Sequence, residues 1–355
     1  MQSLRFLTAG AGAFALAAAL TTSLALPQAA KAEGDLHLFN WSNYFPPELM
    51  EKFEKDTGIS VSLDTYASDE DMLAKIQAGG GGYDIVFPSG STVTVMISQG
   101  LAEKIDASTL PNFKNVMAPH DAPTTDPKRE YSIPYMWGTT GVSYDSEKLG
   151  TLPESWEWYF KPTEEIAQAG LASLNDMRDV YYAAAYYLGV DKCTDNAEEA
   201  QQILDLLLGQ KPHLKLYSSE GTIDRMIAGE VAVHMQWNGA AHRVKEERPS
   251  VVYVYPEEGA TFWSDSMMVP AGAPNKENAK TFLNWMMEPE NAAIASNYTG
   301  YMNAIKGSSE HLEESLKNDP AVNMPEEYAE RLRPFKECNE KAVELRDRVW
   351  TRLKG

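Results

Sequence analysis

The chain has 355 residues, of which 43% are hydrophobic and 23% are charged, a composition typical of globular proteins. This length exceeds what one hydrophobic core usually supports, so we expect two lobes. The formal net charge of −20 argues against nucleic acids and anionic membrane surfaces as partners and permits cationic ones.

Residues 1–32 are typical of a secretory signal peptide. Arg5 gives a positive start, a long uncharged run follows, and an Ala-Lys-Ala sequence resembles a cleavage site that ends at Ala32. We therefore expect cleavage after Ala32. The alternative is an uncleaved membrane anchor, because the uncharged run is long enough to span a bilayer.

Strands and helices alternate in the first third of the chain that follows. Alternating apolar residues predict the strands, while a Pro-Pro pair, a Ser-Asp-Glu-Asp cap and glycines mark helix ends. The predicted order is a strand at 36–39, a helix from Pro46 to Gly58, a strand at 59–63, a helix from Ser68 to Gly79, a strand at 83–87 and a helix at 93–99. This alternation is typical of a parallel sheet covered on both faces, in which ligands bind beyond the carboxyl ends of the strands.

The middle of the chain contains the predicted crossing between lobes. Residues 111–129 lack periodicity and indicate a surface loop. Residues 133–137 and 140–144 are then two extended segments joined at Gly138. We expect the first crossing there, because a new alternation of strands and helices follows.

The rest of the chain repeats the α/β pattern. The predicted elements of the second lobe are strands at 171–174, 231–237 and 251–255 and helices at 177–188 and 195–208, with charged residues 242–248 between the last two strands. Residues 256–259 would return the chain towards the first lobe. The remaining predicted elements are a strand at 261–269, helices at 276–287 and after Pro289, a turn at 298–303 and a basic helix at 333–354.

Phe262-Trp263-Ser264-Asp265-Ser266 sets a carboxylate beside two large aromatic rings. An acid in such surroundings is either held by an internal partner or accepts a cation from outside. Taken alone, the pattern also fits a core strand that runs into a turn. Aromatic, hydroxyl and acidic residues recur at other predicted strand ends, however, and this recurrence favours a ligand.

Four aromatic residues, Trp41, Tyr44, Trp237 and Trp263, lie at comparable strand ends, and Tyr301 lies in a turn. Taken alone, a tryptophan at a strand end fits a core position. Together the five rings describe a box whose faces attract cations and clamp a methylene chain.

Asp176 and Asp179 lie three residues apart at a predicted helix start, which puts both carboxylates on one face of the helix. Acids at this position also satisfy free backbone amides and the helix dipole. A purely structural role is therefore the alternative to ligand binding.

Cys193 and Cys338 are the two cysteines of the chain, and neither belongs to a CxxC or a metal-spaced cluster. In an exported protein they are candidates for a disulfide. Two free, buried thiols are the alternative.

No catalytic signature is present: the chain lacks G-x-S-x-G, H-E-x-x-H, a nucleotide-binding fingerprint and a histidine pair spaced for a metal. We therefore expect no enzyme, no cofactor and no metal. The alternative of another class is a secreted hydrolase in which Asp176 and Asp265 form an acid pair.

Five blocks of sequence carry a family resemblance. The blocks are FNWSNYFPP at 39–47, YDIVFPS at 83–89, YSIPY at 131–135, WNG at 237–239 and FWSDS at 262–266. In this order they resemble the periplasmic spermidine/putrescine-binding proteins of polyamine ABC importers.

The resemblance implies an α/β fold of the type II periplasmic binding proteins, in which two lobes with crossover strands enclose a ligand cleft. The lobes would be residues 33–138 with 264–304 and residues 139–263 with 305–355. The resemblance also implies a soluble, monomeric protein of the periplasm that delivers a polyamine to an inner-membrane ABC permease.

Particular positions acquire roles from the resemblance. Asp176 and Asp179 would hold one ammonium and Asp265 another, while Trp237 and Trp263 would sandwich the aliphatic chain between them. The other implied ligand-binding residues are Trp41, Ser42, Tyr44, Ser89, Ser91, Tyr301 and Lys336.

Several residues depart from the family pattern, and these departures leave the choice between putrescine and spermidine undecided. Ser91 stands where spermidine-preferring relatives carry a Tyr, and Lys336 falls where they use a Gln for the far amine, whereas Trp263 resembles the spermidine type. The resemblance therefore does not choose between putrescine and spermidine. Another organic cation or a cationic amino acid is the alternative within the fold, and it would need a carboxylate-binding arginine such as Arg178 or Arg225.

Overall fold

The computed structural model describes residues 34–79, 81–334 and 336–355. The predicted signal peptide lies outside these residues. These described residues form one compact unit. None of the helices in the described ranges is both long enough and apolar enough to cross a membrane.

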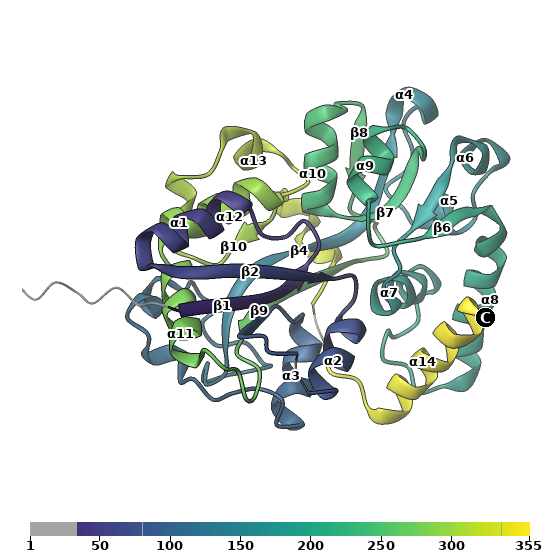
Figure 1. Ribbon diagram of the computed structural model, residues 1–355. Helices are drawn as coiled ribbons and strands as arrows, with labels where there is room; N and C mark the ends of the chain where they lie inside the picture. Colours follow the sequence, from purple (N-terminus) through teal and green to yellow (C-terminus); the bar gives the residue numbers. More distant parts are fainter. Residues whose placement is uncertain (1–33, 80, 335) are drawn as a thin grey trace, which may run out of the picture. The chain divides into compact units, whose positions relative to one another are not determined.

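Strands and helices alternate through most of the unit (Figure 1). The strands are β1 (Gly34–Trp41), β2 (Ile59–Tyr66), β3 (Ile85–Val86), β4 (Ser132–Asp145), β5 (Leu171–Ser173), β6 (Leu214–Tyr217), β7 (Val233–Trp237), β8 (Val251–Val254), β9 (Ala260–Met268), β10 (Met302–Asn303) and β11 (Leu332–Arg333). The α-helices are α1 (Pro47–Thr57), α2 (Asp69–Gln77), α3 (Gly90–Ser98), α4 (Ser146–Leu149), α5 (Glu157–Phe160), α6 (Glu164–Ala169), α7 (Met177–Leu188), α8 (Ala197–Gln210), α9 (Thr222–Ile227), α10 (Asn238–Glu247), α11 (Lys276–Met286), α12 (Pro289–Thr299), α13 (Glu314–Asn318) and α14 (Glu340–Lys354).

The strands form one mixed sheet with the order β2-β1-β3-β9-β4-β7-β5-β6. β1 pairs in parallel with β2 and β3, and β5 pairs in parallel with β6 and β7. Antiparallel β9 and β4 lie between these two parallel groups. The two strand-helix alternations predicted from the sequence are therefore two parallel groups joined by long antiparallel strands.

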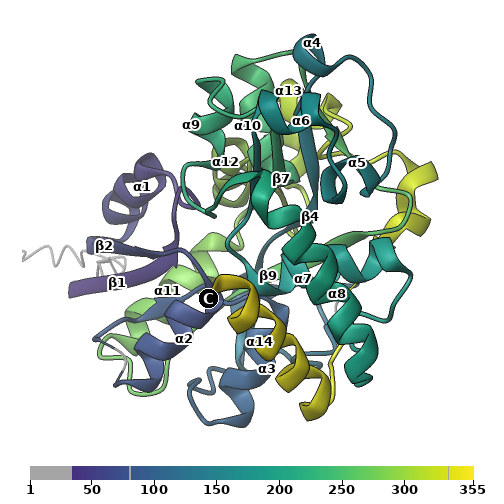
Figure 2. The ribbon, with the colours of Figure 1, turned by 90° about the vertical axis from the view of Figure 1, so that its right-hand side faces the viewer.

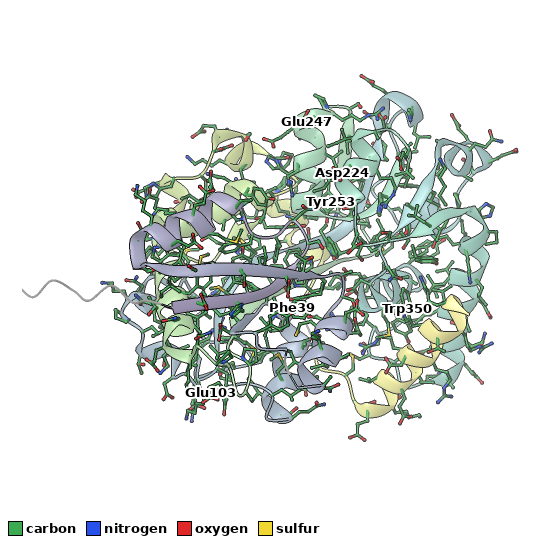
Figure 3. All side chains as sticks on the ribbon, viewed as in Figure 1. Phe39, Glu103, Asp224, Glu247, Tyr253 and Trp350 are labelled. Atoms are coloured by element: carbon green, nitrogen blue, oxygen red, sulfur yellow. A yellow bond between two sulfur atoms is a disulfide. The ribbon has the colours of Figure 1, made fainter. Side chains whose placement is uncertain are left out.

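Two large hydrophobic clusters lie on opposite sides of this junction. The first joins β1 to α1 and α11 through residues such as Leu38, Phe53 and Phe282, and the second packs α7, α8 and α14 together. In Figure 1, α1 and α11 lie at the left and α8 and α14 at the right. A smaller cluster around Phe39, labelled in Figure 3, packs α2 and α3 against the sheet. Mixed α/β structure with two separate cores agrees with the predicted fold class.

β4 is one strand of 14 residues and does not divide into two segments at Gly138 as predicted. Its pairing with β9 shifts register between Pro134 and Trp137. Ile133 belongs to the first large cluster and Val142 to the second. A single extended strand therefore crosses from one core to the other.

Capping residues and glycines in the sequence predicted both ends of helix α7 correctly. α7 begins after Asp176, whose side chain accepts from the Asp179 amide, and it ends before Gly189 in a left-handed conformation with φ of 68°. Of the segment 242–248, predicted only as a charged separator, residues 242–247 belong to α10 and Arg248 is the C-cap of that helix. The last helix begins at Glu340 instead of residue 333, because Leu332–Arg333 pairs with β9 as β11 and Asn339 caps α14.

Cys193 and Cys338 are joined by a disulfide. The bond ties the segment before α8 to the segment before α14, and Figure 2 shows these two helices side by side. Both helices pack in the second large cluster.

Candidate functional site

A cavity of about 550 Å³ opens where the carboxyl ends of β1 and β3 meet the start of α7. Every predicted site residue except Lys336 lines it. These residues are Trp41, Ser42, Tyr44, Ser89, Ser91, Asp176, Asp179, Trp237, Trp263, Asp265 and Tyr301.

Sheet topology explains why residues so distant in sequence converge. Trp41 is the last residue of β1, and Ser89 follows the neighbouring parallel strand β3 at the start of α3. Parallel strands have their carboxyl ends at the same edge of a sheet. Asp265 reaches this edge from β9, where it forms an antiparallel bridge with Ser89.

Asp265 is a buried acid, only 6% exposed, whose partner is the neutral hydroxyl of Tyr44. The Tyr44 hydroxyl donates to Asp265 Oδ2 at 2.8 Å, and the Tyr135 hydroxyl holds Tyr44 by donating to its backbone oxygen at 2.6 Å. Burial raises the pKa of Asp265 well above its usual value, against the opposing effect of the Tyr44 hydrogen bond. Asp265 forms no ion pair within the described ranges of the chain, so an arriving cation would favour its ionised form.

Asp176 and Asp179 form a second acidic position at the start of α7. Asp179 accepts hydrogen bonds from Trp237 Nε1 at 2.8 Å and from the Thr140 hydroxyl at 2.9 Å. Asp176 caps the helix by accepting the Asp179 amide at 2.9 Å. Burial raises the pKa of both carboxyl groups, and the charge of Asp179 raises that of Asp176 further. Asp176 therefore caps helix α7 and also lines the cavity.

Aromatic rings line the cavity together with the two acidic positions. The ring centroids of Trp41 and Trp237 are 6.3 Å apart at 72°, and those of Trp263 and Tyr301 are 5.1 Å apart at 70°. Tyr44 packs against Tyr301 at 5.5 Å. The cavity therefore combines carboxylates with flat apolar surfaces that carry a negative potential on their faces.

Two glycines make the close approach of these rings feasible. A β-carbon on Gly239 would lie 2.4 Å from Cδ1 of Tyr301, and one on Gly138 would lie 2.7 Å from Cζ2 of Trp263. Both distances are too short for non-bonded carbon atoms. The block WNG at 237–239 contains one of these glycines, but its sequence alone does not reveal the ring above it.

Sequence reasoning missed Asp69, which it assigned only to a helix cap. Asp69 is buried, lines the cavity and accepts a hydrogen bond from the Ser89 hydroxyl. The guanidinium of Arg178 lies 3.3 Å from Asp69 Oδ2 and 3.2 Å from Glu70 Oε1. An acid within the Ser-Asp-Glu-Asp cap and an arginine between Asp176 and Asp179 are the only sequence signals for this pair.

Neither arginine considered for a ligand carboxylate is arranged for that role. Arg178 lines the cavity, but its guanidinium is occupied by Asp69 and Glu70. Arg225 Nη2 donates to the backbone oxygen of Glu220 at 3.0 Å.

Lys336 is not brought together with the other predicted residues. Its ammonium lies 2.6 Å from Asp191 Oδ2, and its side chain is 54% exposed. It lines a second cavity of about 290 Å³. The lysine that lines the main cavity is instead Lys192, which sequence reasoning did not single out.

No group of three or more His, Cys, Asp or Glu side chains is placed to hold a metal ion within residues 34–79, 81–334 and 336–355.

Comparison with known proteins agrees with this architecture. Residues 48–325 match the family model described as bacterial extracellular solute-binding protein. The chain is 33% identical over 336 residues to the putrescine-binding periplasmic protein SpuD of Pseudomonas aeruginosa, covering 90% of this chain and 92% of that protein. It is 33% identical over 310 residues to the spermidine/putrescine-binding periplasmic protein of Salmonella typhimurium, covering 86% and 88%.

Solved structures show the same fold. The TpPotD lipoprotein of Treponema pallidum has a TM-score of 0.78 and 28% identity, covering 90% of this chain and 99% of that chain. The spermidine/putrescine ABC transporter substrate-binding protein PotD of Streptococcus pneumoniae has a TM-score of 0.74 and 28% identity, covering 91% and 99%. The fold is that of the two-lobed type II periplasmic binding proteins, and the chain belongs to the bacterial extracellular solute-binding proteins.

Proposed function

We propose that this protein is a periplasmic solute-binding protein that captures a polyamine, putrescine or spermidine, for import by an ABC transporter. The observation that carries the proposal is the arrangement of the cavity. Asp265 and Asp179 are buried acids, Asp176 is half-buried, and aromatic rings line the same cavity. The names of the relatives support the same ligand class.

The chemistry of a polyamine fits these groups. A polyamine is a row of ammonium groups separated by methylenes, so its recognition needs carboxylates at intervals with flat apolar faces between them. Asp265 would hold one ammonium, Asp176 and Asp179 another, and Trp237 and Trp263 would flank the methylenes. Each buried carboxylate costs several kcal/mol to desolvate, and a charge-assisted hydrogen bond to the ligand offsets that cost.

Ligand-driven closure follows from the same energetics. We propose lobes formed by residues 33–138 with 264–304 and by residues 139–263 with 305–355. Asp265 would belong to the first lobe, and Asp176 and Asp179 to the second. A dication that bridges them stabilises the closed form more than the open form, which shifts the population towards closure.

A transport role without catalysis is part of this proposal. The relatives are named as binding proteins, and the role proposed for the acids is to hold the ammonium groups of the ligand. We propose that the mature protein works in the periplasm, needs no cofactor and passes its ligand to an inner-membrane permease.

Isothermal titration calorimetry tests the proposal directly. The chain from residue 33 is stripped of ligand by unfolding and refolding, and is then titrated with putrescine, spermidine and arginine. We expect saturable one-to-one binding to a polyamine, far tighter than to arginine. Absence of heat with both polyamines would refute the polyamine assignment and leave the family membership in place.

A further inference from the structure

Lys192 places a buried ammonium in a cavity that is also lined by several acids and by the arginines Arg129, Arg178 and Arg243. Lys192 is 8% exposed, and its Nζ donates a hydrogen bond to the backbone oxygen of Pro334 at 2.6 Å. The ammonium lies over the rings of Tyr182 and Tyr186, 5.1 Å and 5.9 Å from their centroids. No carboxylate forms an ion pair with Lys192 in the part of the chain that the structure describes.

The local carboxylate that could have neutralised Lys192 has another partner. Asp191, its neighbour in the chain, pairs with Lys336. Lys192 is therefore held by a carbonyl oxygen and by ring faces, and its positive charge is not cancelled by a paired acid. Burial lowers the pKa of Lys192 to about 8, which leaves it mostly protonated at neutral pH.

The cavity runs from the α7 acids to Lys192. Asp179 and Tyr182 lie three residues apart on α7, which puts them on one face of the helix, and both line the cavity. Lys192 covers the ring of Tyr182. A ligand that extends beyond Asp179 along α7 therefore approaches the Lys192 ammonium.

The position of Lys192 is fixed from both sides. Pro334 binds its ammonium, and the next residue in the chain, Cys193, is bonded to Cys338. Its charge also occupies tyrosine faces that would otherwise attract a ligand cation. The side chain therefore has little freedom to withdraw from an approaching ammonium.

We infer that Lys192 is a specificity-determining residue whose ammonium makes the site favour a ligand with two ammonium groups over a ligand with three. This inference rests on the proposed polyamine function. The diamine is satisfied by the acids of the cavity, whereas the third ammonium of a triamine that extends along α7 meets a like charge. Lys336, which the resemblance placed at the position of the far amine, does not line this cavity.

Calorimetry on charge variants tests the inference. Lys192→Met removes the ammonium and keeps an unbranched chain, Lys192→Arg keeps the charge, and Lys336→Met is the matched control outside the cavity. We expect Lys192→Met to raise the affinity for spermidine about tenfold or more. Its affinity for putrescine should change by less than about threefold. Lys192→Arg and Lys336→Met should leave the preference for putrescine over spermidine in place.

A second measurement needs no variant and so does not depend on how Lys192→Met folds. N-butylputrescine has the length of spermidine but ends in a methyl group instead of an ammonium. We expect the unaltered protein to bind it more tightly than spermidine, because the uncharged end avoids the repulsion.

The outcomes separate the inference from the proposed function. If putrescine binds, but spermidine binds as tightly and Lys192→Met changes neither affinity, the inference is wrong and the function stands. Spermidine binding at least as tightly as N-butylputrescine would overturn the inference in the same way. If neither polyamine binds the unaltered protein, the proposed function itself fails.

Discussion

Single residues define the chemistry of the cavity, because two of its buried acids, Asp265 and Asp179, have neutral hydrogen-bond partners. Asp265 accepts from the Tyr44 hydroxyl, and Asp179 accepts from the Trp237 ring nitrogen. Neutral donors satisfy the oxygen atoms geometrically but leave the negative charge uncompensated. Such a site is satisfied fully only when a cation arrives.

Asp265→Asn should weaken polyamine binding at least tenfold, about 1.4 kcal/mol, because the ligand ammonium loses its counter-charge. The asparagine keeps the volume and can still accept the Tyr44 hydrogen bond. The exposed Asp205 of α8 offers a control, and Asp205→Asn should bind normally. Calorimetry with the preferred polyamine measures both variants. Near-normal affinity of Asp265→Asn would remove Asp265 from the proposed site.

Trp263→Ala should lose affinity without unfolding the protein. The ring is half-buried at the cavity, packs edge-on against Tyr301 and lies against the first large cluster without being one of its buried members. Its removal therefore takes a flat surface from the ligand and leaves the buried members of both large clusters in place. Trp263→Phe, which keeps a smaller ring face, should bind with intermediate affinity. Calorimetry gives the affinities and circular dichroism monitors folding. Equal binding by all three proteins would show that the ring does not contact the ligand.

At the scale of elements, the cavity depends on close contacts between the start of α10 and the segment after α12. Gly239 is the second residue of α10, and Tyr301 follows Gly300, which ends α12. The Tyr301 ring occupies the space in which a side chain on Gly239 would lie. The orientation of Tyr301 is therefore set by a residue without a side chain.

Gly239→Ala should displace Tyr301 and lower both polyamine affinity and thermal stability. The added β-carbon would lie 2.4 Å from the ring, so either the ring or the helix start must move. Gly209→Ala is the matched control, because it adds the same carbon within helix α8 with nothing within 4 Å. The control should keep its affinity and gain up to about 1 kcal/mol from higher helix propensity. Thermal unfolding and calorimetry compare the two variants, and identical behaviour would contradict the packing argument.

Elements with strong local signals could be predicted from the sequence, and those set by distant contacts could not. α7 follows from the Asp176 cap and the terminal Gly189, both of which are local. The convergence of Trp41 and Ser89 follows from the geometry of parallel strands. The placement of Lys192 in the cavity depends on the path of the segment at Pro334, which the disulfide joins to it from far along the chain. No local sequence pattern predicts the contact between Lys192 and the segment at Pro334.

At the scale of the whole molecule, charge opposes stability in the ligand-free protein. The formal net charge is −20, and several acids are buried in one cavity. Burial raises the pKa of Asp69, Asp176, Asp179 and Asp265, so ionisation of these groups costs folding free energy. A bound polycation would reduce both the repulsion between the negative charges and the cost of ionising the buried acids.

The raised pKa of Asp265 makes the stability of the ligand-free protein depend on pH, and the direction of this effect can be worked out. The pKa of Asp265 is raised by burial above its unfolded value of about 3.9. Between these two values the Asp265 carboxyl holds a proton in the folded state and not in the unfolded state. Its contribution to stability is therefore fully present below about pH 4 and is lost as the pH rises through the folded pKa. The melting temperature of the ligand-free protein should therefore fall less steeply with rising pH in Asp265→Asn than in the unaltered chain.

Melting curves from pH 5 to 9 measure that difference, and the comparison isolates Asp265. The pKa of His234 is lowered to about 4 and that of Lys192 to about 8, both mainly by burial, but both groups are present in the two proteins and their effects cancel. Since an ammonium favours the ionised carboxylates, ligand binding should release protons, which calorimetry in buffers of different ionisation enthalpy detects. Parallel melting curves for the two proteins, together with binding that releases no protons, would mean that Asp265 is already ionised in the empty cavity. The ligand ammonium would then pair with a carboxylate that is already charged, and burial of Asp265 would not couple ligand capture to pH.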